Sequence, residues 1–143
     1  MLSGVVVSPE AVKAYEDIRK HKSAKYLILT ITDSKEITVE TKGDRKATYG
    51  SFLKLMKTFE NECRYIIFDY PVASQREGLA GVFIDRLLLI SWCPCRASIR
   101  QKTLFASSYR ALVKAFDGIY KSIQACDFEE LSQKVMEDNI LRF

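Results

Sequence analysis

A run of basic side chains with no acidic neighbour stands between residues 96 and 114 of this 143-residue chain. Its basic members are Arg96, Arg100, Lys102, Arg110 and Lys114. A polar stripe with spacings of three and four crosses the same run: Arg100, Thr103, Ser107, Arg110 and Lys114. Such spacing places the stripe on one side of a helix. The positive field can dock on an acidic protein surface or on phosphates, although a solvated charged face is the commoner origin of this spacing.

The cysteines are the other residues whose side chains could react or bind a metal. The four cysteines are Cys63, Cys93, Cys95 and Cys126. Only one residue separates Cys93 from Cys95, whereas thioredoxin motifs have two, and no second ligand pair lies at zinc-binding spacing. No nucleophile motif surrounds the single histidine, His21. We therefore expect structural thiols in a reducing cytosol, with no metal, no cofactor and no catalytic residue. A thiol enzyme at Cys93 and Cys95 is the weakest alternative.

Composition argues against several other classes. Twenty-two Lys and Arg against 18 Asp and Glu give a net charge of +4, which is too small for a protein that binds mainly to the nucleic acid backbone. No Gly-rich phosphate loop follows a candidate strand. The longest strongly apolar run, residues 87–90, is far shorter than the ~20 residues of a membrane-spanning helix, and the first residues lack a signal-peptide pattern. We expect one domain, with no nucleic-acid partner and no membrane insertion.

Helix and strand signals alternate along the chain. In order, we expect a helix opening at Ser8-Pro9, a hairpin of strands over 26–31 and 37–39, a short helix capped by Thr48, strands over 63–70 and 82–92, a long helix opening at Ser98, a short strand within 119–125, and a helix opening at Asp127. Residues 65–68 are all apolar, which indicates a strand covered on both faces. Residues 1–7 predict a flexible tail, and residues 71–82 a projecting hairpin loop.

Four segments form a set known from one protein family. They are Ser3-Gly4-Val5, Cys63-Arg64-Tyr65 leading to Asp69-Tyr70, Trp92-Cys93-Pro94, and the run from Lys102 through Ala106-Ser107-Ser108. Together with the element order, they resemble the ADF/cofilin family over nearly the whole chain. The resemblance implies one ADF-homology domain over residues 1–143, of the α/β class (α+β type), with a central mixed sheet of about five strands sandwiched between pairs of helices. It also implies a monomeric, non-enzymatic protein, cytoplasmic and cytoskeleton-associated, that binds actin and promotes filament disassembly and turnover.

The resemblance also implies which residues meet an actin monomer. They are Ser3, Gly4, Val5, Arg96, Arg100, Lys102, Thr103, Ser107 and Arg110. Thr103 stands where the family usually has methionine, so the apolar part of docking is weakened. Cys95 stands where an acidic residue is usual, which makes this edge more basic. Ser3 is the expected phosphorylation site, since a phosphate of about −1.5 to −2 charges would oppose binding to an acidic partner.

A second surface, implied for filament binding, looks impoverished in this chain. Its positions are Ile84, Arg86, Asp138, Asn139 and Arg142. Two basic positions of the family fall on Ile84 and Arg86, so only one charge survives, and Asp85 lies between them. A lost charged contact costs about 1–3 kcal/mol, which lowers filament affinity by roughly one to two decades. We predict strong monomer binding with weak filament side binding and severing.

Two alternatives stay open at this stage. One is a glia-maturation-factor-like protein that regulates branched-filament nucleation and ignores actin itself; the Ser3-Gly4 start and the Arg100/Lys102 pair argue against it. The other is a phosphoinositide-responsive membrane-surface module that uses residues 19–25 and 96–114. Phosphoinositides are in either case a candidate second ligand.

Overall fold

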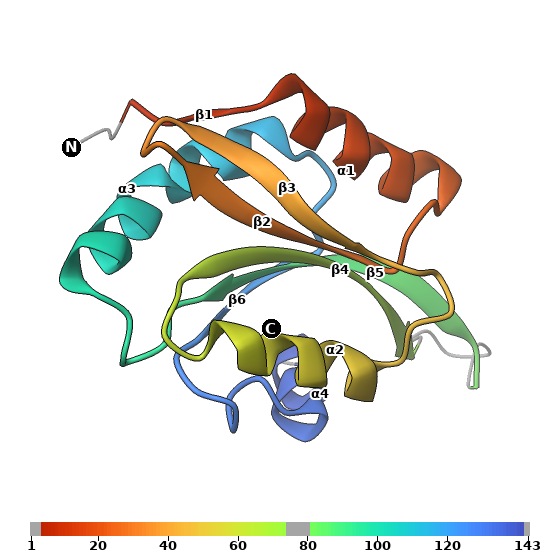
Figure 1. Ribbon diagram of the computed structural model, residues 1–143. Coiled ribbons are helices and arrows are strands. Elements are labelled where there is room, and N and C mark those ends of the chain that lie inside the picture. The colour runs from red at the N-terminus through yellow and green to blue at the C-terminus, as the bar shows by residue number, and fades with distance from the viewer. Residues whose placement is uncertain (1–3, 74–80, 142–143) are drawn as a thin grey trace.

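The computed structural model describes residues 4–73 and 81–141, which form one curled six-stranded sheet with two helices on each face (Figure 1). The strands are β1 (Val6–Val7), β2 (Tyr26–Thr32), β3 (Glu36–Gly43), β4 (Arg64–Ala73), β5 (Phe83–Trp92) and β6 (Lys121–Ala125), in the sheet order β1-β3-β2-β4-β5-β6. The helices are α1 (Pro9–His21), α2 (Tyr49–Met56), α3 (Ile99–Ala115) and α4 (Gln133–Leu141), with a 3-10 turn at Lys57–Phe59. The predicted mixed sheet between helix pairs is confirmed, with one strand more than expected.

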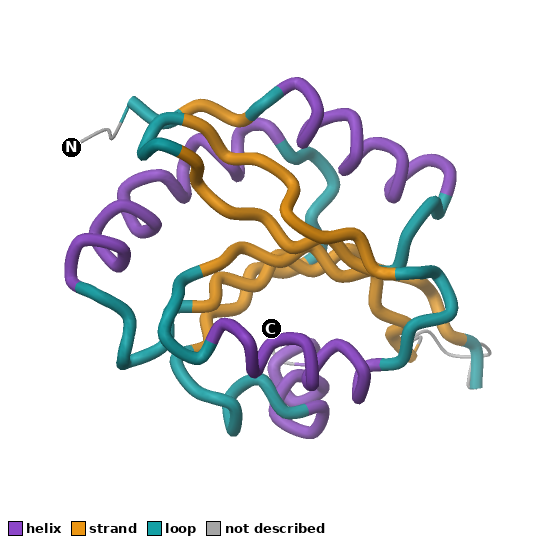
Figure 2. Tube along the Cα trace, viewed as in Figure 1, coloured by secondary structure: helices purple, strands orange, loops and turns teal. Residues whose placement is uncertain are grey.

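The two faces of the sheet carry separate apolar cores, because successive side chains of a strand point to opposite faces. On one face, α1 and α3 pack over Leu27, Tyr65 and Leu89. On the other face, α2 and α4 pack over Phe68 and Ile90. Figure 2 shows this separation, with one helix pair above the strands and the other below. Coverage of both faces explains why residues 65–68 are all apolar.

Pairing within the sheet is antiparallel at its centre and parallel at its margins. β2 pairs with β3 and β4, and β4 with β5, in antiparallel ladders. β1 runs parallel to β3, and β6 runs parallel to β5. Gly43 ends β3 where the Tyr26 ring leaves no room for a side chain: a Cβ there would lie 2.1 Å from a ring carbon. The open end of the β2–β3 hairpin, where Gly43 pairs with Tyr26, therefore has a position that only glycine fits.

Local capping cues set the starts of α1 and α2, as the sequence predicted. Ser8 accepts a hydrogen bond from the N–H of Ala11 at 3.0 Å, and Pro9 follows as the first residue of α1. Thr48 and Ser51 form a reciprocal capping box at α2. The helix starts are thus determined locally, since each cap supplies acceptors for otherwise unpaired N–H groups.

Three boundaries differ from the sequence-based expectation. The expected flexible tail over residues 1–7 is wrong for its last residues, because Val6–Val7 form β1 and Val5 is buried. The expected loop over 71–82 is wrong for residues 71–73, which continue β4; Pro71 is tolerated there because β2 pairs β4 only as far as Phe68, so Pro71 lies on a free edge. Residues 1–3 and 74–80 lie outside the described residues.

The third difference concerns the last helix, which was expected to open at Asp127. Asp127 does accept the N–H of Glu130 at 2.8 Å, but the turn that it caps is not continued. α4 begins at Gln133, six residues later. The cap spacing of Asp127 and Glu130 therefore corresponds to a single turn. A capping residue stabilises only the first turn, and a helix continues only where its apolar side chains find tertiary contacts.

Candidate functional site

The start of α3 is fixed both by its own cap and by the sheet. Ser98 has an extended backbone, and its Oγ accepts the N–H of Gln101 at 3.1 Å. Gln101 does not complete a capping box. Its Oε1 instead accepts the N–H of Cys63 at 2.8 Å, just before β4. The predicted cap is therefore confirmed, and a contact distant in sequence anchors the first turn of α3.

The basic stripe of α3 faces solvent. Arg100, Thr103 and Arg110 are exposed, and Ser107 is half-buried with its hydroxyl donating to the carbonyl of Leu104. Within the described residues, no ion pair engages Arg100, Arg110 or Arg96. Guanidinium groups without an internal partner are available to a carboxylate of another molecule.

Two residues in the first turns of α3 have surroundings that the sequence did not predict. Lys102 is half-buried, and its Nζ donates to the carbonyl of Cys95 at 2.9 Å, so this ammonium is turned toward the loop that precedes the helix. Ile99 is 83% exposed at the first position of α3. Sequence reasoning missed Ile99, although it is an apolar residue outside the spacing of the buried face. It places an exposed apolar side chain directly before Arg100, the first cation of the stripe.

The N-terminal segment lies against α3, so residues far apart in sequence share one surface (Figure 1). Gly4 is exposed in the left-handed region with φ of +77°, a conformation that favours glycine. Val6 is 58% exposed, whereas the neighbouring Val5 is 5% exposed and belongs to the core. The side chain of Val5 therefore contributes to the core, and its assignment as an actin-contact residue stays a prediction. Ser3 lies outside the described residues.

The predicted filament surface lies on a two-stranded ribbon where β4 and β5 extend beyond the other strands (Figure 2). Ile84 is 37% exposed, and the apolar Phe83 beside it is 65% exposed. Arg86 is exposed, with its guanidinium 5.1 Å from the ring centre of Tyr120, which lies before β6. The one surviving cation is thus held against an aromatic ring by a cation–π contact.

Asp85 joins an ion-pair network that the sequence did not reveal. Its carboxylate lies 3.1 Å from Arg45, in the loop between β3 and α2, and 3.8 Å from Lys22 at the C-cap of α1. Both cations also pair with Asp69, at 2.8 Å for Arg45 and 3.0 Å for Lys22. Asp69 is fully buried, and its Oδ1 has no hydrogen-bond partner in the described part of the chain. Asp85 therefore neutralises cations that would otherwise enrich this surface.

The remaining filament positions lie in α4 and beyond it. Asp138 is exposed, and Asn139 is half-buried with its carbonyl accepting the Nζ of Lys121 from β6. Arg142 lies outside the described residues. The described part of α4 thus presents an exposed acidic side chain at a position assigned to the filament surface.

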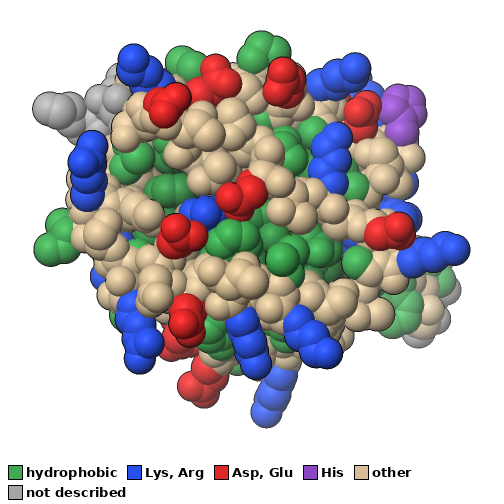
Figure 3. All heavy atoms as spheres, in the orientation of Figure 1, with side chains coloured by type: hydrophobic (Ala, Val, Ile, Leu, Met, Phe, Trp, Pro, Cys, Tyr) green, Lys and Arg blue, Asp and Glu red, His purple; other side chains and the backbone are tan. Residues whose placement is uncertain are grey.

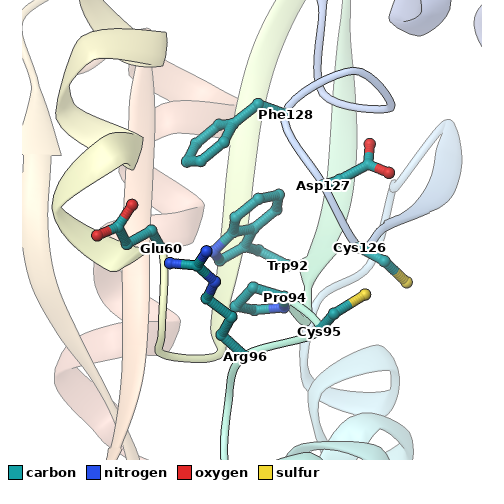
Figure 4. A pocket seen from close by; sticks show the side chains of 8 residues that line it. All are labelled: Glu60, Trp92, Pro94, Cys95, Arg96, Cys126, Asp127 and Phe128. Atoms are coloured by element: carbon teal, nitrogen blue, oxygen red, sulfur yellow. The ribbon is translucent and has the colours of Figure 1, made fainter.

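The thiols gather at the end of the sheet that leads into α3. Cys63 and Cys93 lie with their sulfur atoms 3.6 Å apart, and all four cysteines are free. Burial raises the pKa of the Cys63 thiol to about 12, helped by its hydrogen bond with Cys93. Cys95 and Cys126 are exposed and line a shallow hollow floored by Trp92 (Figure 4). Among the described residues, no group of three or more potential ligands could hold a metal ion.

Charges of both signs are mixed on the face of the molecule seen in Figure 3. Figure 3 shows Lys and Arg side chains interspersed with Asp and Glu across the face seen in Figure 1. This pattern differs from the continuous basic face of a nucleic-acid-binding domain. In the part of the chain that the structure describes, no helix is long and apolar enough to cross a bilayer.

Comparisons with known proteins define the class to which this fold and surface belong. Residues 4–141 match the family of cofilin/tropomyosin-type actin-binding proteins. The chain is 36% identical to cofilin of Schizosaccharomyces pombe over 141 residues, which cover 98% of this chain and 97% of that protein. The structure of Streptomyces griseoflavus cofilin matches with a TM-score of 0.81 and 31% identity, covering 96% of this chain and 99% of that one. Actin depolymerization factor 2 of Plasmodium berghei matches with a TM-score of 0.84 and 28% identity, over 99% of this chain and 100% of that one.

The chain therefore belongs to the ADF/cofilin family. It is a non-enzymatic, actin-binding and actin-depolymerizing protein with the ADF-homology fold. The family expected from the four sequence segments is confirmed.

Proposed function

We propose that this protein binds an actin monomer through one continuous surface made by the N-terminal segment and α3. The residues assigned to it are Ser3, Gly4, Arg96, Arg100, Lys102, Thr103, Ser107 and Arg110, with Val6 and Ile99 added from the structure. The observation that carries the proposal is the juxtaposition of Arg100 and Arg110, which make no ion pair with any described residue, with exposed apolar side chains from two separate segments. Apolar anchors ringed by charge are typical of protein interfaces.

Charge reversal tests this assignment. Arg100→Glu combined with Arg110→Glu changes two exposed groups that make no internal ion pair within the described residues, so the fold is preserved. Affinity for actin monomers falls by at least about tenfold, because two attractions become repulsions. Lys54→Glu on α2, an exposed residue on the opposite face of the sheet, serves as the matched control. Equal affinity of the reversed variant and the control contradicts the assignment.

We also propose that filament side binding and severing are weak. Ile84 offers no charge, Arg86 is stacked on Tyr120, and Asp85 neutralises Arg45. Sedimentation of actin filaments at graded protein concentrations separates the modes. The proposal expects actin to move into the supernatant with little protein in the pellet. Saturable co-pelleting without a rise in soluble actin refutes it.

Phosphorylation of Ser3 is proposed as an off switch. Ser3 directly precedes the exposed Gly4. A phosphate here adds about −1.5 to −2 charges to a surface whose exposed arginines are cationic, and would repel an acidic partner. Ser3→Glu weakens monomer binding in an equilibrium titration, and Ser3→Ala leaves it intact. Unchanged affinity of the Glu variant refutes the switch.

The phosphoinositide alternative receives less support from the residues around the end of α1. Arg19 and Lys20 pair with Glu16, and Lys22 pairs with Asp69, so much of this cluster is internally neutralised. Phosphoinositide binding through the stripe of α3 stays a prediction, as do a monomeric state and a cytoplasmic location at the actin cytoskeleton. Flotation with phosphoinositide vesicles checks the first of these.

A further inference from the structure

Cys63 and Cys93 have the geometry of a disulfide that has not yet closed. Arg64 faces Trp92 in the antiparallel ladder of β4 and β5, so the next position places Cys63 opposite Cys93. The N–H of Cys63 donates to Gln101, and the N–H of Cys93 donates to the carbonyl of Ala125 at 2.9 Å. Neither N–H pairs with the opposite cysteine, which marks a non-hydrogen-bonded pair, the closer of the two kinds, with Cα atoms about 4.5 Å apart.

This spacing already satisfies the requirements of a disulfide. Disulfides span Cα separations of about 4.4–6.8 Å, and their sulfur atoms lie about 2.05 Å apart. The sulfur atoms of Cys63 and Cys93 are 3.6 Å apart. Side-chain rotation with little backbone movement brings them together. We propose that Cys63 and Cys93 are an oxidation site at which a peroxide closes a reversible disulfide, and that the closed form binds actin monomers more weakly.

The two thiols differ in access, which sets the order of the chemistry. Cys63 is fully buried, and its raised pKa keeps it protonated at neutral pH. Cys93 is partly exposed and lines a hollow between α3 and β6 together with Lys102 and Tyr109. Hydrogen peroxide therefore meets Cys93 first.

The oxidation of the two thiols to a disulfide proceeds in two steps. The sulfur of Cys93 attacks one peroxide oxygen, the O–O bond breaks, and a sulfenic acid forms with release of one water. The sulfur of Cys63 then attacks the sulfur of Cys93; the S–S bond forms as the S–O bond breaks, and the hydroxyl leaves with the Cys63 proton as a second water. Peroxide is reduced and both thiols are oxidised. A dithiol such as dithiothreitol reverses the result.

The effect on actin binding rests on the proposed function and follows from the backbone around the pair. Cys63 is tied to the first turn of α3 through Gln101. The segment after Cys93 carries the Cys95 carbonyl that accepts Lys102. The small backbone adjustment that accompanies closure of the disulfide acts on both hydrogen bonds, so the start of the basic stripe shifts slightly. We expect monomer affinity to fall roughly twofold to tenfold, the range of one lost hydrogen bond or charged contact.

The test begins with Cys95→Ser combined with Cys126→Ser, which removes the two exposed thiols shown in Figure 4 and leaves only the proposed pair. The matched control adds Cys93→Ala, a partly exposed position where truncation is tolerated. Both proteins are treated with hydrogen peroxide, blocked with an alkylating reagent and digested with trypsin. The expected product is a peptide of residues 58–64 linked to one of residues 87–96, absent from the control and lost after dithiothreitol treatment.

Actin-monomer titrations of the reduced and oxidised proteins complete the test. The proposal expects weaker binding after oxidation only where Cys93 is present. Absence of the linked peptide overturns the oxidation site, and a linked protein with unchanged affinity overturns the regulatory effect. If the reduced protein fails to bind actin, the proposed function fails, while the peptide linkage still decides whether the site exists.

Discussion

Restoring one basic residue at Ile84 should strengthen filament binding. Ile84 lies on the exposed ribbon of β4 and β5 and is 37% exposed, so Ile84→Arg places a guanidinium in solvent without opening a core cavity. Among the described residues, Lys22 at the C-cap of α1 and Arg45 in the loop before α2 face the carboxylates of Asp69 and Asp85 on the two strands, and Arg86 lies on β5. A new cation there is not matched by a free carboxylate in the network, so it is available to the filament.

The size of the effect follows from the exposure of this ribbon. An exposed charged contact contributes about 0.2–1 kcal/mol, and one that the partner desolvates contributes about 1–3 kcal/mol. We take about 1 kcal/mol for a residue that is one third exposed, which corresponds to roughly fivefold tighter filament binding. Adding Asp85→Asn releases part of the charge of Arg45 and should raise the gain to roughly tenfold or more.

Co-sedimentation with actin filaments at graded protein concentration measures this gain. Asn61→Arg, at an exposed turn before β4, adds the same charge at the opposite end of the strand and serves as the control. If Ile84→Arg binds filaments no better than the natural sequence, or no better than the Asn61 variant, the account of the weak filament surface is refuted.

Three further predictions concern the stability of the fold. Asp69→Asn should lower the free energy of unfolding by about 2–4 kcal/mol, below the full value for a buried pair because its cationic partners are partly exposed; urea denaturation measures it. Gly43→Ala should cost about 1–3 kcal/mol, since its methyl group meets the Tyr26 ring, and a lowered midpoint of thermal unfolding checks this. Burial raises the pKa of Tyr15 from 10.0 to about 12, so its contribution is present below pH 10 and is lost as pH rises through 12; Tyr15→Phe should flatten the fall in stability over that window, and an unchanged slope contradicts the assignment.

Local signals in the sequence account for most of the fold. The Ser8-Pro9 pair and Ser98 open helices as expected, because a cap acts within a few residues. The apolar run at 65–68 correctly indicated a strand covered on both faces. β1 was missed because two residues carry no periodicity, and its pairing depends on β3, some thirty residues away.

The functional surfaces were harder to predict from the sequence wherever a contact between distant segments decides the role of a side chain. The stripe of α3 follows from spacing, since helical geometry alone brings its members together. The burial of Val5, the tie between Gln101 and Cys63, and the neutralisation of Arg45 by Asp85 depend on segments that meet only in the folded chain. Sequence patterns identify the charges, and the folded structure shows which of them are already paired.

The central claim is that the N-terminal segment and α3 together contact an actin monomer. Hydrogen–deuterium exchange of this protein, with and without saturating monomeric actin, tests it most directly. The account predicts slower exchange over residues 4–7 and 96–110, with no change over α2 and α4. Slower exchange confined to α2 and α4, with residues 4–7 and 96–110 unaffected, would contradict it.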